Sequence, residues 1–155
     1  MTFSDVLEAQ QALALVAHLQ EYFASQLIHA TQAIDPAEFK RTDWLRDEGL
    51  HGGGWRLGKI QTPAFNRASI NVSQVHYDDT PEKRLSSATA VSTIIHPEHP
   101  LAPSFHMHIS WTQMRDGTGY WRLMADLNPS IVKDEHKRAF DAALLAGSGE
   151  YLEEG

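Results

Sequence analysis

Two histidines, His106 and His108, stand two residues apart in a segment where polar and apolar residues alternate. Successive side chains of a β-strand point to opposite faces, so both imidazoles would project from one face, about 7 Å apart. The opposite face would be apolar, formed by Phe105, Met107, Ile109 and Trp111. Imidazoles at this spacing can share a metal ion, bind one ligand, or exchange protons with it near neutral pH.

Neighbouring predicted strands add polar side chains to the face of the two histidines. With matching parity these side chains are Ser92, His96, Arg122 and Asp126. The simpler alternative is a solvated sheet face, which antiparallel sheets commonly have. A cupin-like metal site also uses His-x-His, but it requires a glutamate a few residues later, and residues 111–114 supply none.

The shared face depends on one turn, between Met114 and Tyr120. A two-residue turn would pair odd with even positions and would place Leu123 beside the histidines. We therefore predict a loop of three or five residues, with Gly117 or Gly119 at positive φ.

The elements that would position this face predict an α+β fold. Apolar residues at three-and-four spacing predict a helix over residues 4–33, capped by Ser4, and Asp35 and Pro36 then restart a short helix at 35–38. Trp44 and Leu45 would pack beneath that short helix. Five strands follow, at residues 59–66, 69–77, 88–96, 104–113 and 119–127, and then a helix at 132–146 that ends at Gly147. Short connections favour an antiparallel meander flanked by helices, in a single domain over residues 1–155.

A glycine-rich run occupies residues 49–58 and contains Gly52, Gly53 and Gly54. We expect a loop. A turn that leads into a strand and a backbone cradle for an anion both remain possible, although the Lys-Ser/Thr of a phosphate loop is missing.

Composition excludes several classes of protein. The 155 residues include 20 acidic and 13 basic side chains, a formal charge of −7, which disfavours nucleic acid as a partner. The absence of cysteine excludes disulfides, thiol catalysis and iron–sulfur clusters. No apolar run is long enough to span a membrane, and no signal peptide is evident. We expect a soluble, cytoplasmic protein.

Five segments, in order, resemble the oxygen-dependent coproporphyrinogen-III oxidase family. They are residues 52–56, 65–76, 91–97, 103–107 and 126–129, with a characteristic ten-residue step from His96 to His106. The resemblance covers about residues 52–129, and more loosely the flanking helices, so the chain resembles the N-terminal half of the family. It implies a large antiparallel sheet flanked by helices, usually in a homodimer.

The resemblance also implies an activity: the oxidative decarboxylation of two propionates of coproporphyrinogen III by dioxygen, which gives protoporphyrinogen IX in haem synthesis without a required cofactor. Ser92 would contact the substrate, His106 would be the proton donor, and Asp126 would meet the pyrrole nitrogens. His96 and His106 match positions proposed to hold a divalent metal, with His136 as the candidate third ligand.

Two departures from the family pattern affect substrate binding. The family continues as His-x-Asn-x-Arg, whereas this chain has His108 and Ser110 at the last two positions. Serine cannot replace a guanidinium that pairs with a carboxylate. Arg122 or Arg56 could take over this role, and His108 could contribute when protonated. A non-catalytic relative that binds a tetrapyrrole or another anionic ligand is therefore the alternative function, and an unpaired sheet edge favours self-association.

Overall fold

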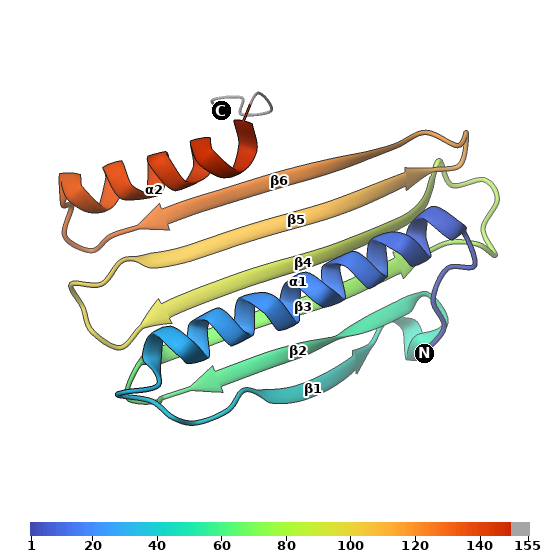
Figure 1. The fold of residues 1–155 in the computed structure, drawn as a ribbon. Coiled ribbons are helices and arrows are strands. Elements are labelled where there is room, and N and C mark those ends of the chain that lie inside the picture. Colours follow the sequence, from blue (N-terminus) through green and yellow to red (C-terminus); the bar gives the residue numbers. More distant parts are fainter. Residues whose placement is uncertain (150–155) are drawn as a thin grey trace.

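The computed structural model describes residues 1–149 as a six-stranded antiparallel sheet with two helices (Figure 1). The elements in chain order are α1 (Leu7–Thr31), β1 (Lys40–Leu45), a 3-10 turn η1 (Asp47–Gly49), β2 (Gly52–Ile60), β3 (Phe65–His76), β4 (Leu85–Pro97), β5 (Ser104–Met114), β6 (Gly119–Asn128) and α2 (Asp134–Ser148). The strands follow one another across the sheet in sequence order. The predicted α+β meander is confirmed, with one strand more than expected.

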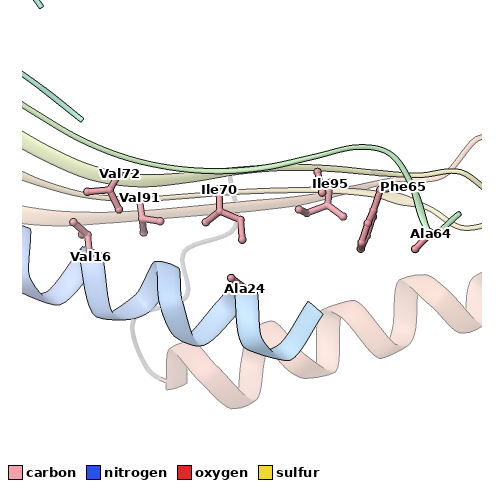
Figure 2. Packing of buried hydrophobic residues seen from close by; sticks show 9 residues of the cluster. Val16, Ala24, Ala64, Phe65, Ile70, Val72, Val91 and Ile95 are labelled. Atoms are coloured by element: carbon pink, nitrogen blue, oxygen red, sulfur yellow. The ribbon is translucent and has the colours of Figure 1, made fainter. Parts of the chain in front are cut away.

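Both helices lie on the same side of the sheet (Figure 2). Val16 and Ala24 of α1 are buried in one cluster with Ile70 and Val91, and burial of such side chains is the main favourable term in folding. The docking of α2 places the ring of Phe140 6.1 Å from that of Phe105. No helix among residues 1–149 covers the other sheet face, which is left open.

The register places the histidines on this open face. His106 pairs with Asp126, and Ser110 pairs with Arg122. The turn between β5 and β6 is the cause, because it has three residues between Met114 and Thr118, and Gly117 adopts a φ of 87°. The predicted odd-numbered loop is confirmed.

The helix and strand boundaries predicted from the sequence are wrong between residues 35 and 66. No short helix forms at residues 35–38, and Trp44 lies in β1, where its indole N–H donates to Asn71 Oδ1 at 2.9 Å. Most of the expected loop at 49–58 is strand β2, and the expected strand at 59–66 is interrupted by a turn. Gln61, in that turn, has a φ of 53°.

The glycine run has a structural role at the start of β2, between β1 and β3. Gly52 has a φ of 97°, a region that side chains disfavour. A Cβ on Gly54 would collide with the carbonyl oxygen of Val72 on β3. Of the two alternatives for the glycine run, the structure therefore shows the turn that leads into a strand. It gives no support to a backbone cradle for an anion.

The helix ends also differ from the prediction. Ser4 is not the cap of α1, because its buried backbone N–H donates to Gln74 Oε1 at 2.8 Å and the cap position is Val6. Helix α2 continues through Gly147 and ends at Ser148, and the cap residue Gly149 has a φ of 55°. Within residues 1–149, neither helix combines the length and apolar character needed to cross a membrane.

Candidate active site on the open sheet face

His106 is the centre of a cluster of three side chains from three adjacent strands. Its Nδ1 lies 2.9 Å from Asp126 Oδ1, and its Nε2 lies 3.1 Å from His96 Nε2. A protonated His106 would form an ion pair with the Asp126 carboxylate at this distance. In the hydrogen bond between the two Nε2 atoms, one imidazole donates and the other accepts. The arrangement holds one exchangeable proton between two imidazoles beside a carboxylate.

Asn128 also belongs to this cluster, although it was not among the predicted site residues. Its Nδ2 donates to Asp126 Oδ1 at 2.9 Å and lies 3.3 Å from His106 Nδ1. Both contacts of the carboxylate are made through Oδ1, and Asp126 Oδ2 has no hydrogen-bond or ion-pair partner among residues 1–149. Alternation along β6 was the signal available, since Asn128 is two positions beyond Asp126.

A second polar pair adjoins the first. Ser92 Oγ lies 2.8 Å from His108 Nδ1, across the pairing of β4 with β5. These two side chains, with His106, Met124 and Asp126, line a hollow of ≈ 270 Å³ on the open face. The structure thus brings together all of the predicted side chains except Arg122, and four of them, Ser92, His106, His108 and Asp126, border a space that a ligand can enter.

The two arginines predicted to replace the missing guanidinium lie on the open face but on opposite sides of His106. Arg122 is directly across from Ser110. Arg56 is on β2, three strands from β5, which is about 14 Å at the usual strand spacing. Neither touches the His106 cluster, so each could reach only an outer part of a ligand bound there.

The predicted metal site is not assembled. His96 and His106 are adjacent, but His136 lies in the first turn of α2, the helix that packs on the other face through Phe140. Within residues 1–149 there is no group of three His, Asp or Glu side chains that could hold a metal ion. His136 as third ligand was therefore a wrong prediction, because the side of the sheet that α2 covers is not encoded in the spacing of the histidines.

Comparison with known proteins identifies the family of this fold and site. The family model described as coproporphyrinogen III oxidase matches residues 14–149, so the chain belongs to that family. An oxygen-dependent coproporphyrinogen-III oxidase from Rickettsia akari (strain Hartford) is 27% identical over 131 residues, which cover 78% of this chain and 45% of that protein. A protein of the same name from Prochlorococcus marinus subsp. pastoris is 30% identical over 122 residues, which cover 68% of this chain and 34% of that protein. The chain spans less than half the length of these relatives.

Proposed function

We propose that the open sheet face binds coproporphyrinogen III and that the chain catalyses its oxygen-dependent oxidative decarboxylation. The observation that best supports this proposal is the cluster of Asp126, His106 and His96 in the middle of this face. Arg122 lies on one side of the cluster and Arg56 on the other. Membership of the family and the names of the relatives support the same reaction.

The reaction needs proton transfer and an electron acceptor. Each reacting propionate loses its carboxylate as carbon dioxide and a hydride equivalent from the methylene bonded to the pyrrole, and the C–C bond electrons released by carbon dioxide form the double bond of the vinyl group. Dioxygen accepts the two electrons and, with the hydrogen and one proton, becomes hydrogen peroxide. His106 is placed to supply and recover that proton, because His96 can reload its Nε2 across 3.1 Å.

Asp126 has two roles in this proposal. Its Oδ1 lies 2.9 Å from His106 Nδ1 and would stabilise the positive charge of that imidazole when it is protonated. Its Oδ2 is available to accept a pyrrole N–H, which would centre the macrocycle over the ≈ 270 Å³ hollow. Ser92 and His108 border the same hollow and would contact the ring or its substituents.

A second candidate function is binding without turnover. Ser110 lacks the charge that the family uses at this position, and the His106 cluster is open to solvent, with Asp126 60% exposed. A reactive intermediate is normally shielded from water. A protein with this face alone could hold a tetrapyrrole or another anionic ligand without oxidising it.

One pair of measurements separates the two functions. Oxygen uptake and carbon dioxide release are followed with coproporphyrinogen III, and the oxidised porphyrin is titrated onto the same protein. Turnover with equal amounts of oxygen consumed and carbon dioxide released supports the enzyme. Binding without turnover supports the second candidate, and neither binding nor turnover rejects both.

We also propose that the chain forms a homodimer through its β6 side. Within residues 1–149, β6 pairs only with β5, which leaves an open row of backbone groups. Trp121 and Leu123 of this strand are 44% and 55% exposed. Exposed apolar side chains beside an open strand edge are typical of an association surface.

A further inference from the structure

A second hollow lies on the open face, over β1, β2 and β3. It has a volume of ≈ 450 Å³, and its lining includes Lys40, Arg56 and Arg67. Gly58 and Ser69, which pair with each other and contribute little or no side chain, form its floor between these longer side chains. The hollow is therefore a groove whose walls are long cationic side chains.

The cations of this groove have no partners within the protein. Among residues 1–149, no ion pair or side-chain hydrogen bond involves Lys40, Arg56 or Arg67, whereas the lysine beneath them, Lys59, is paired with Asp35. One carboxylate, that of Glu38, also lines the groove. In a chain of formal charge −7, this local excess of unpaired positive charge favours binding of a ligand of opposite sign.

The groove is continuous with the histidine cluster. Arg67 on β3 is directly opposite His96 on β4, and His96 is hydrogen-bonded to His106 on β5. Two strand spacings across the sheet and two residues along it, about 12 Å, separate Arg67 from His106, because His106 pairs with Ile94. A ligand centred over His106 can therefore extend a carboxylate arm into the groove.

We infer that this groove is a carboxylate-binding subsite for propionates of the tetrapyrrole, with Arg67 and Arg56 as its principal contacts. The inference rests on the proposed function, because it takes the macrocycle to lie over His106. A guanidinium can hold a carboxylate through two parallel hydrogen bonds, and such contacts are among the strongest in recognition. The groove thus supplies on β2 and β3 the positive charge that Ser110 does not supply on β5.

Binding of coproporphyrin III, the oxidised tetracarboxylate, tests the inference by titration at low salt. We expect Arg67→Gln and Arg56→Gln each to weaken binding about ten-fold, the loss typical of one charged hydrogen-bonded contact. Gly58→Leu should weaken binding without any change of charge, since it fills the groove. Arg138→Gln, on the exposed surface of α2, removes the same charge elsewhere and should bind like the unmodified chain. Circular dichroism verifies the fold of each variant.

The tetramethyl ester of the porphyrin is the matched ligand control. It keeps the macrocycle but carries no carboxylates, so it should bind weakly and equally to the unmodified chain and to Arg67→Gln. Unchanged binding of coproporphyrin III by Arg67→Gln, Arg56→Gln and Gly58→Leu would overturn the subsite and leave the proposed function standing. No binding by the unmodified chain would overturn both.

Discussion

Asp35 is a buried carboxylate whose loss should destabilise the whole domain. Its Oδ2 accepts from Thr62 Oγ1 at 2.7 Å and from Lys59 Nζ at 3.3 Å, and its Oδ1 accepts from the backbone N–H of Ala37 at 3.2 Å. The side chains of Asp35 and Lys59 are each 1% exposed. Asp35→Asn would leave the lysine buried without its counter-charge.

The size of the effect follows from the burial of this pair. Breaking a buried ion pair by removal of one partner costs about 3 to 5 kcal/mol. We expect a value near the lower end, because the Lys59 ammonium also lies 5.1 Å from the ring of Phe39 and 5.7 Å from that of Phe65. A loss of about 3 kcal/mol in a chain of this size lowers the melting temperature by roughly 6 to 12 °C.

The same carboxylate predicts a dependence on pH. The hydrogen bond from Thr62, with the further contribution of Lys59, holds the pKa of Asp35 below its usual value. A lowered folded-state pKa stabilises the protein above the unfolded pKa of about 3.9, and the contribution is lost as the pH falls through the folded value. The difference between the parent and Asp35→Asn should therefore be constant near pH 7 and shrink below about pH 4.

Urea denaturation followed by tryptophan fluorescence measures these differences. Asp43→Asn is the matched control, since it breaks the ion pair with Arg41 at the surface, where the two side chains are 59% and 55% exposed. The free energy of unfolding of that variant should be lower than that of the parent by less than about 1 kcal/mol. Equal midpoints for Asp35→Asn and the parent at pH 7 would refute the reasoning, and recovery of stability in Asp35→Asn/Lys59→Met would support it.

Three further predictions concern the sheet and its open edge. Gly54→Ala should cost about 3 kcal/mol in urea unfolding, because its Cβ would meet the β3 backbone, whereas Gly147→Ala, with open space around it, should cost nothing. Arg122→Gln should weaken coproporphyrin binding. Adding Ser110→Arg to that variant should restore binding, because the positive charge moves only to the facing strand. Binding that does not recover in the double variant would argue against a carboxylate contact at this place. Analytical ultracentrifugation should show a concentration-dependent dimer that Leu123→Lys dissociates, and a parent that stays monomeric throughout would contradict the β6 interface.

Strands β3 to β6 were predictable from the sequence, and β1 and β2 were not. In β5 the polar and apolar residues alternate, and the glycine of the following turn marks the register. β1 carries no such signal, because five of its six residues are exposed in an edge strand rich in charged side chains. The glycines of β2 have no side chains to alternate, so their strand resembled a loop.

The missed site residues required knowledge of the register across several strands. Arg67 faces the histidine cluster only because β3 pairs with β4 in a particular alignment, and the turn at residues 61–64 fixes where β3 begins. Pro63 in this segment was the available sign that a strand could not continue through it. His136 was misplaced for a related reason, since spacing along the chain does not tell which face a helix covers.

The central claim is that His106 transfers a proton during oxidation of a tetrapyrrole bound to the open face. The most direct measurement is the rate of hydrogen peroxide and vinyl-product formation from coproporphyrinogen III by the parent and by His106→Ala, with the affinity for coproporphyrin III measured on both. The account predicts a rate at least about 100-fold lower in the variant with little change in affinity, because a positioned acid or base contributes about 10² to 10⁴ in rate. Equal rates in the two proteins would contradict it.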